Sequence, residues 1–276
     1  MNRLRFWTLV PARALNFLFF LVPMGIVVLY SLMTRGPYGG QAPPFNLDNY
    51  VRLADPLYLT ILLRSFWIAG ISTFFAMLLG FPLALFIANS GKSRSMYLNL
   101  VMLPFWTSFL VRTYAWMFLL RDTGLINSGL MALGVIREPL PMLYNDAAVV
   151  LGLVYGYLPF MVLPIYSTLE KLDPSLLEAA ADLGATPWVS LWRVTVPLAL
   201  PGIVAGSILV FIPCLGAYLT PDLLGGGKSV MIGNVVQNQF TTARDWPFGA
   251  SLSLVLTGLV MVLLWLFVRK GGDKYL

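Results

Sequence analysis

The feature that most constrains this chain is a series of long apolar runs, most of them close to the length that a helix needs to cross a bilayer. The six runs cover residues 14–33, 65–88, 97–120, 147–168, 203–218 and 250–268. In hydrocarbon every backbone polar group must be satisfied within the segment, which favours helices. The sequence therefore predicts an all-α integral membrane protein, a single transmembrane domain over residues 1–276 with six transmembrane helices in the lipid bilayer.

Composition excludes several other classes of protein. Hydrophobic residues make up 58% of the 276 residues and charged residues only 11%, too little charge to cover a soluble surface. The net charge of +6 is explained by Lys and Arg in cytoplasmic loops, so no nucleic-acid partner is expected. The single cysteine, Cys214, excludes an internal disulfide, and the absence of histidine excludes histidine-based metal sites and Ser-His triads. We expect no catalytic residue and no metal site.

Basic residues at the N-terminus raise the alternative of a signal peptide. Arg3, Arg5 and Arg13 precede the first apolar run. That run is about 20 residues long, enough to span a bilayer, and no small-x-small cleavage site follows it. The sequence therefore predicts a first transmembrane helix that is retained.

The distribution of Lys and Arg predicts the orientation in the membrane. Six spans place both termini on one side, and that side carries ten basic residues against seven on the other. The ten are Arg3, Arg5, Arg13, Lys92, Arg94, Lys171, Arg193, Arg269, Lys270 and Lys274. Because basic loops stay inside, we expect a multi-pass protein of the bacterial inner membrane with both termini cytoplasmic.

The polar stretch over residues 173–203, between spans four and five, predicts two short helices joined by a tight turn. Asp173 or Ser175 can cap the first helix, and Glu178 stands three residues after Ser175 as in a capping box. Gly184 lies where a residue after the helix adopts a positive φ. Thr186-Pro187 is a second cap. Such a short helix is marginal alone, so it should dock on another surface.

This stretch resembles the EAA loop of ABC-importer permeases, through Glu178-Ala179-Ala180, Gly184 and Val194-Thr195-Val196-Pro197. Val194 and Val196 stand where the family pattern has Ile and Leu. The resemblance implies the type I ABC-importer permease fold and a cytoplasmic coupling helix that fits a cleft of an ATPase. The coupling residues it implies are Glu178, Ala179, Ala180, Asp182 and Gly184. The alternative is an ordinary amphipathic helix at the membrane interface.

A glycine-rich stretch, Gly225-Gly226-Gly227-Lys228-Ser229, invites comparison with a phosphate-binding P-loop. The pattern requires a further glycine at the position of Asp222, and no strand precedes it. We interpret the stretch as a turn outside the cell. No nucleotide cofactor is expected on this chain, so ATP and Mg²⁺ must be used by a partner ATPase.

Further stretches resemble the spermidine/putrescine branch of these permeases, over about residues 46–262. They are Asn49-Tyr50, Asp55-Pro56-Leu57-Tyr58, Pro104-Phe105-Trp106-Thr107-Ser108, Arg112-Thr113-Tyr114, Gly124-Leu125-Ile126-Asn127, Leu158-Pro159-Phe160-Met161, Thr220-Pro221-Asp222-Leu223-Leu224-Gly225-Gly226 and Arg244-Asp245-Trp246-Pro247-Phe248-Gly249-Ala250. The resemblance implies a dimer of ATP-binding subunits, a second, dissimilar permease and a periplasmic substrate-binding protein. It also leaves other small amines, opines or amino-acid derivatives open as substrates.

Polyamines are flexible polycations, so a path for them needs carboxylates at its entrance and aromatic faces along it. The hypothesis for this path names Asp222, Tyr218, Tyr155, Tyr157 and Trp106. The alternatives are a helix-ending turn for Asp222 and ordinary packing for the tyrosines.

Arg112, inside span three, is a charge about eight residues from the outer end of that span. It either has a function or is paired with another charge, or its side chain extends toward the outer membrane interface. A stand-alone secondary transporter is disfavoured because the spans contain no acidic residue for ion coupling, and an intramembrane enzyme because a G-x-S-x-G motif is missing.

Overall fold

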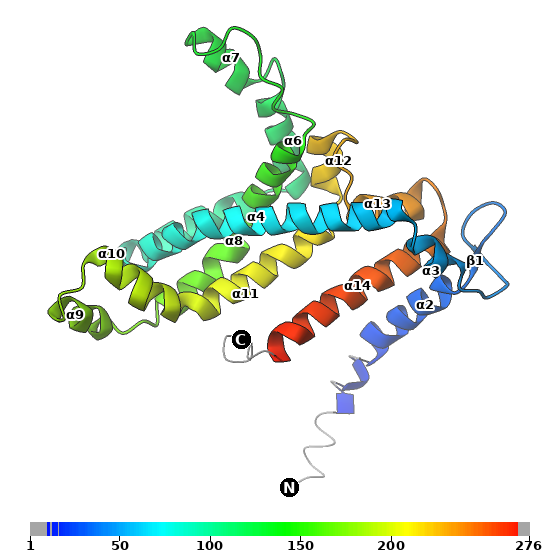
Figure 1. Ribbon diagram of the computed structural model, residues 1–276, viewed down its shortest axis with the longest axis horizontal. Coiled ribbons are helices and arrows are strands. Elements are labelled where there is room, and N and C mark those ends of the chain that lie inside the picture. Colours follow the sequence, from blue (N-terminus) through cyan, green and yellow to red (C-terminus); the bar gives the residue numbers. More distant parts are fainter. Residues whose placement is uncertain (1–9, 12, 16, 270–276) are drawn as a thin grey trace. The chain divides into compact units, whose positions relative to one another are not determined.

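The computed structural model describes residues 10, 11, 13–15 and 17–269, which are mostly helical (Figure 1). The described residues form two compact units. The first contains the chain up to Thr60 together with Val235–Leu264, and the second contains Ile61–Asn234 and the residues from Trp265 onward. Four of the basic residues used to predict orientation, Arg3, Arg5, Lys270 and Lys274, lie outside the described residues, as do Asn16 of the first span and both chain termini.

The second unit holds most of the helices. Its elements are α4 (Pro56–Ala88, from Ile61 onward), the 3₁₀ helices η2 (Gly91–Ser93) and η3 (Leu103–Trp106), α5 (Arg94–Met102), α6 (Phe109–Leu120), α7 (Leu125–Ala132), α8 (Asp146–Leu169), α9 (Ser175–Asp182), α10 (Pro187–Ser190), the π-helix η4 (Leu191–Thr195), α11 (Val196–Leu215) and α12 (Leu219–Gly225).

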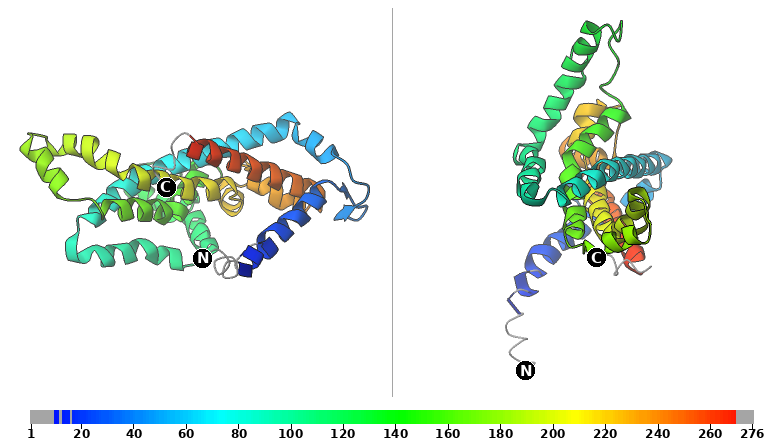
Figure 2. Two further views of the ribbon diagram at one scale, coloured as in Figure 1. Left: turned by 90° about the horizontal axis from the view of Figure 1, so that it is seen from below. Right: turned by 90° about the vertical axis from the view of Figure 1, so that its left-hand side faces the viewer.

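The core of the second unit is the pair formed by α8 and α11, which lie side by side in Figures 1 and 2. Gly202 and Gly206 of α11 have the G-x-x-x-G spacing that lets two membrane helices approach closely. A Cβ atom at Gly206 would lie 2.9 Å from the Met161 sulfur and 3.0 Å from the Met161 carbonyl oxygen of α8. The two backbones are therefore in close contact, and only glycine fits between them.

The short helices lie at the two ends of this pair. Helices α9 and α10 lie at one end of α8 and α11, and α12 lies at the other end, where it packs against α8 and α6 (Figures 1 and 2). Glu178 of α9 and Asp222 of α12 are therefore separated by the length of α8, about 36 Å for a helix of 24 residues.

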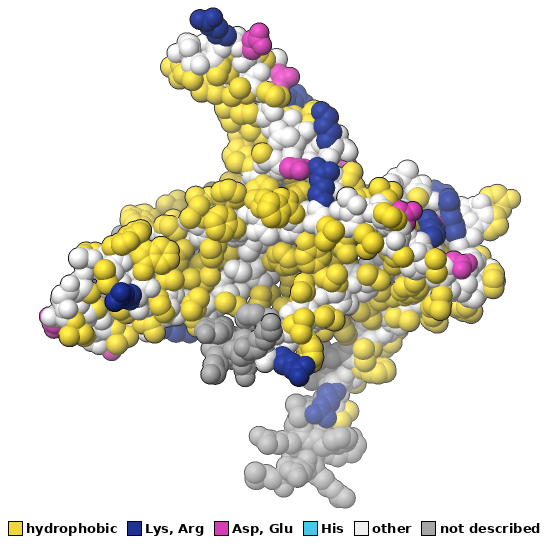
Figure 3. Space-filling view, viewed as in Figure 1, with side chains coloured by type: hydrophobic (Ala, Val, Ile, Leu, Met, Phe, Trp, Pro, Cys, Tyr) yellow, Lys and Arg dark blue, Asp and Glu magenta, His cyan; other side chains and the backbone are white. Residues whose placement is uncertain are grey.

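Five helical segments of the described chain are long and apolar enough to cross a membrane, which confirms the predicted fold class. They are Arg13–Ser31, Pro56–Ala88, Asp146–Leu169, Pro187–Leu215 and Trp246–Leu266. Hydrophobic side chains cover much of the visible face of α4 and α11 (Figure 3). Helix α4 begins before residue 65, and the fifth predicted span begins before residue 203 and ends at Leu215.

The third predicted span, residues 97–120, is not one helix. It is divided into α5, η3 and α6, so the count of six continuous spans is not reproduced in the described residues. Pro104 cannot donate a backbone hydrogen bond and disfavours a continuous α-helix. Thr107 is extended, with ψ 153°, and its hydroxyl donates to the Pro104 carbonyl at 2.7 Å. The break therefore lies directly before the first turn of α6.

The first unit contains η1 (Phe17–Leu21), α2 (Val22–Ser31), a hairpin of β1 (Thr34–Arg35) and β2 (Gln41–Ala42), α3 (Asp48–Leu53), most of α13 (Ile232–Thr241) and α14 (Trp246–Arg269, up to Leu264). The hairpin is antiparallel, with Thr34 opposite Ala42 and Arg35 opposite Gln41. Arg52 pairs with the buried Asp245 at 2.9 Å and so ties α3 to the start of α14.

Candidate functional site

Asp173 lies directly before Pro174, the N-cap residue of α9. Its carboxylate accepts a hydrogen bond from the Ser175 backbone N–H at 2.9 Å, and this hydrogen bond lowers the pKa of the Asp173 carboxyl. Because Ser175 lies inside the helix and its N–H is already used, the predicted capping box between Ser175 and Glu178 does not form. Of the two candidates for the cap, neither is the N-cap residue, and only Asp173 accepts a backbone hydrogen bond at this end of the helix.

The end of α9 has the predicted glycine turn. Gly184 has φ +81°, a conformation that side chains with a Cβ atom adopt only with strain. The Ala185 N–H donates to the Ala180 carbonyl at 3.0 Å, and the Gly184 N–H donates to the Ala181 carbonyl at 2.8 Å. These two bonds form a Schellman motif, which closes the helix and redirects the chain toward α10.

Helix α9 presents the residues expected to contact an ATPase. Glu178, Ala179 and Asp182 are exposed, and Ala180 is half-buried. None of the eight residues of α9 is buried. The apolar Leu183, just after the helix, is also 89% exposed. An eight-residue helix gains little stability without packing, so this surface is suited to a partner that covers it.

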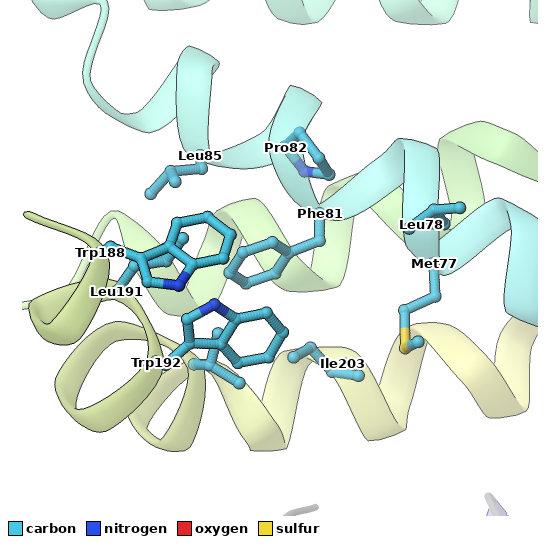
Figure 4. Close-up of a pocket in the computed structure, with 10 residues that line it drawn as sticks. Met77, Leu78, Phe81, Pro82, Leu85, Trp188, Leu191, Trp192 and Ile203 are labelled. Carbon is cyan, nitrogen blue, oxygen red and sulfur yellow. The ribbon is translucent and has the colours of Figure 1, made fainter.

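Helix α10 and the π-helix η4 lie beside α4 around an apolar pocket, whereas α9, the helix that the sequence analysis expects to dock, has no buried residue. Thr186 caps α10, with its hydroxyl accepting from the Val189 N–H at 3.4 Å. Trp188 and Trp192 contact each other edge to face at 5.8 Å between ring centroids. They line an apolar pocket of about 350 Å³ with Phe81 of α4 (Figure 4). The remaining lining residues are Met77, Leu78, Pro82, Leu85, Leu191, Val196 and Ile203.

An aromatic cluster lies at the break before α6. Tyr157 of α8 lies 6.1 Å from Phe109 and 6.2 Å from Phe160, and Phe160 contacts Phe105 edge to face at 5.2 Å. Trp106, in the break itself, is 76% exposed. Sequence analysis proposed Tyr157 and Trp106 for the substrate path but did not predict that Phe105, Phe109 and Phe160 form this cluster with Tyr157. Their positions near a proline in an apolar run were the available signal.

Tyr155 of α8 makes a separate aromatic contact with α6. Its ring meets Trp116 of α6 edge to face at 5.5 Å. The next residue of α6, Met117, lines a separate hollow of about 360 Å³ together with Asp222, Lys228 and Tyr144. Asp222 is exposed in that hollow, and Tyr218 is 46% exposed just before α12. The structure thus divides the predicted path residues between aromatic contacts on α6 and α8 and the hollow that holds Asp222 and Lys228.

The glycine-rich stretch after α12 is a turn, as predicted. Gly226 and Gly227 have φ values of +54° and +76°. Ser229 is buried, and its hydroxyl donates to the Asp146 carboxylate, which also pairs with Arg64 at 2.7 Å. These contacts fasten the turn to the start of α8. Among the described residues, no group of three or more Cys, Asp or Glu side chains is arranged to hold a metal ion.

Apolar helices of spanning length, with a short exposed helix between two of them, define an integral membrane protein. The family described as the binding-protein-dependent transport system inner membrane component matches residues 11–271, and the chain belongs to this family. It is thus a membrane component of a transport system and not a catalytic subunit.

Two of the similar proteins share the name spermidine/putrescine transport system permease protein PotB. PotB of Escherichia coli (strain K12) is 44% identical over 261 residues, covering 93% of this chain and 95% of PotB. PotB of Salmonella typhimurium (strain LT2) is 45% identical, covering 93% of this chain and 91% of PotB. A chain in the crystal structure of a bacterial ABC transporter for alginate import has a TM-score of 0.76 and 18% identity, covering 98% of this chain and 95% of that chain. This last likeness confirms the ABC-importer permease fold.

Proposed function

We propose that this chain is one of two dissimilar permease subunits of an ABC importer for spermidine, putrescine or a similar small cationic amine. The observation that carries the proposal is the 44–45% identity to PotB proteins over 93% of the chain. The importer would also contain a dimer of ATP-binding subunits, which supplies the energy, and a periplasmic binding protein, which delivers the amine.

The proposed contact with the ATPase is α9. Its exposed residues Glu178, Ala179 and Asp182 enter the ATPase cleft, and Gly184 sets the angle at which α9 leaves the chain. Movement of the ATPase is passed to the transmembrane helices through α10 and η4, because these pack against α4 and continue into α11. The support for this assignment is the capped, exposed and glycine-terminated form of α9.

The proposed substrate path begins at the opposite end of α8 and α11. Asp222 attracts the cationic amine into the hollow beside α12, where Tyr218 is exposed. The amine then meets the faces of Tyr155, Tyr157 and the exposed Trp106. Cation–π contacts of about 0.5–2 kcal/mol each bind an amine without holding it too tightly to be released.

The substrate proposal is tested by uptake into proteoliposomes that contain this chain, its partner permease and the ATPase, with the binding protein outside. Uptake of labelled spermidine or putrescine should depend on ATP and be competed by other polyamines. Asp222→Asn keeps the size of the side chain and should lower uptake by about threefold, since one entrance charge is lost. A system that prefers an opine, an amino-acid derivative or an anion would contradict the proposed substrate.

The orientation of the chain is tested with single cysteines. Cys214 is buried, so Cys214→Ala gives a background without a competing thiol. Lys228→Cys should react with an impermeant thiol reagent from the periplasmic side, whereas Asp182→Cys should react only after the inner membrane is opened. The reverse labelling pattern would place α9 outside and remove the proposed ATPase contact.

A further inference from the structure

Arg112 is a buried cation held by aromatic rings. It lies in the first turn of α6 and is 9% exposed. Its guanidinium carbon lies 5.5 Å from the centroid of the Phe105 ring and 5.5 Å from that of Phe109. Its Nε is buried without an acceptor, and the ion pairs found among the described residues, Arg52–Asp245, Arg64–Asp146 and Arg94–Glu170, do not include it.

Such an arrangement is unusual for a residue that only stabilises a fold. A buried charge costs several kcal/mol unless it is paired, and cation–π contacts offset only part of that cost. The aromatic rings are well fixed, because Phe109 rests on Gly156 of α8, where a Cβ atom would lie 2.9 Å from the ring. The guanidinium is therefore the weakly held member of the cluster, and the rings are the rigid members.

The position of Arg112 also favours exchange with a ligand. The break over Leu103–Ser108 separates α5 from α6 directly before Arg112, and its residues Trp106, Thr107 and Ser108 are exposed. Irregular backbone at membrane depth is tolerated where it lines a cavity or is buried in protein. Broken helices of this kind concentrate at the substrate sites of transporters.

We propose that Arg112 is a tethered cation that occupies the faces of Phe105 and Phe109 when no substrate is present, and that an ammonium group of the substrate displaces it. The inference rests on the proposed function, since it requires a cationic amine. Arg112 then sets specificity in two ways. It blocks the aromatic faces to uncharged solutes, and it weakens the binding of the amine enough for release, because a like charge remains nearby.

The proposal is tested by equilibrium binding of labelled spermidine to the assembled complex of both permeases and the ATPase in nanodiscs, without the binding protein. Arg112→Gln removes the competing charge and should tighten spermidine binding by about 3- to 10-fold. Arg112→Lys keeps the charge and should bind as the wild type does. Adding Phe109→Ala to Arg112→Gln should abolish the gain, because one of the contested faces is lost.

The outcomes separate this inference from the proposed function. Spermidine uptake by the complete wild-type system reports on the proposed function, and the ratio of Arg112→Gln to wild-type binding reports on the tethered cation. Unchanged or weaker binding by an intact Arg112→Gln complex would overturn the inference while leaving polyamine transport standing. If instead Arg112→Gln dissociates the two permeases and Arg112→Lys does not, Arg112 pairs with a carboxylate of the partner, and the tethered-cation role is wrong.

Discussion

The two arms of the segment between α8 and α11 differ in what covers them. Neither α9 nor α10 has a buried residue, but α10 and η4 place Trp188 and Trp192 beside Phe81 of α4 and end at the buried Thr195. At the start of each arm a side chain accepts a hydrogen bond from a backbone N–H, Asp173 before α9 and Thr186 before α10. The difference therefore does not come from the residues that begin each helix. The arm of α9 is therefore exposed, and the arm of α10 and η4 lies beside the transmembrane helices. Changes at the turn of Gly184, which is the joint between the two arms, and changes in each arm should therefore have different effects.

The largest effect is expected at the joint. Gly184→Val forces a β-branched residue to φ +81°, a strain of about 2 kcal/mol, although no atom lies within 4 Å of the position of the new Cβ. We expect uptake to fall by about 30-fold, with loss of substrate-stimulated ATP hydrolysis and normal membrane insertion. Reconstituted uptake and ATP hydrolysis, measured on the same complex, check this.

Gly184→Asn is the matched control, since asparagine tolerates a positive φ. It should retain most of the uptake. Because the site has room for a side chain, a loss of uptake with asparagine equal to that with valine would mean that contact with the ATPase, and not backbone conformation, determines the effect.

An intermediate effect is expected in the covered arm. Trp192 is 55% exposed, so Trp192→Ala removes only part of a full aromatic burial and should loosen α10 and η4 on α4 by about 1 kcal/mol. Uptake should fall by about fivefold, while copurification with the ATPase stays normal because α9 is intact. Trp192→Phe should restore uptake. Loss of copurification in Trp192→Ala would show that the two arms are not independent.

The smallest effect is expected in the free arm. Glu178 is exposed in the first turn of α9, where a negative charge interacts favourably with the helix dipole. Glu178→Ala should lower uptake by about twofold, through weaker association with the ATPase. The loss should shrink at high ionic strength, since exposed charges are screened by salt. A loss of uptake that matches Gly184→Val would place Glu178 in a buried contact with the ATPase.

The parts of this segment that sequence analysis predicted are those decided by neighbouring residues. The turn at Gly184 and the cap at Thr186 depend on backbone geometry within a few positions, and both are confirmed. The choice between Asp173 and Ser175 as the cap was not decidable, because both stand at acceptable positions before the same helix. The packing of Trp192 on α4 joins residues more than 100 positions apart, and no local pattern indicates it.

The contacts of the aromatic cluster are even harder to predict from sequence. Tyr157 and Trp106 were singled out from sequence, but the pairing of Arg112 with Phe105 and Phe109 depends on the break at Pro104, which an apolar run conceals. Apolarity alone predicts that residues 97–120 cross the membrane in one piece. Whether a proline interrupts such a helix is decided by the helices around it, which satisfy the freed backbone groups.

The close fit of α11 on α8 at Gly206 has a mechanical consequence. Two helices in backbone contact cannot slide or rotate past one another without separating, so α8 and α11 tilt together as one stiff lever about 30 Å long. Its short arm is the segment that leads to α9, and its far end supports α12 and the hollow of Asp222. A rotation of about 10° at the proposed ATPase end would displace the far end by about 5 Å over that length, enough to open or close the proposed path without any change in the packing between the two helices.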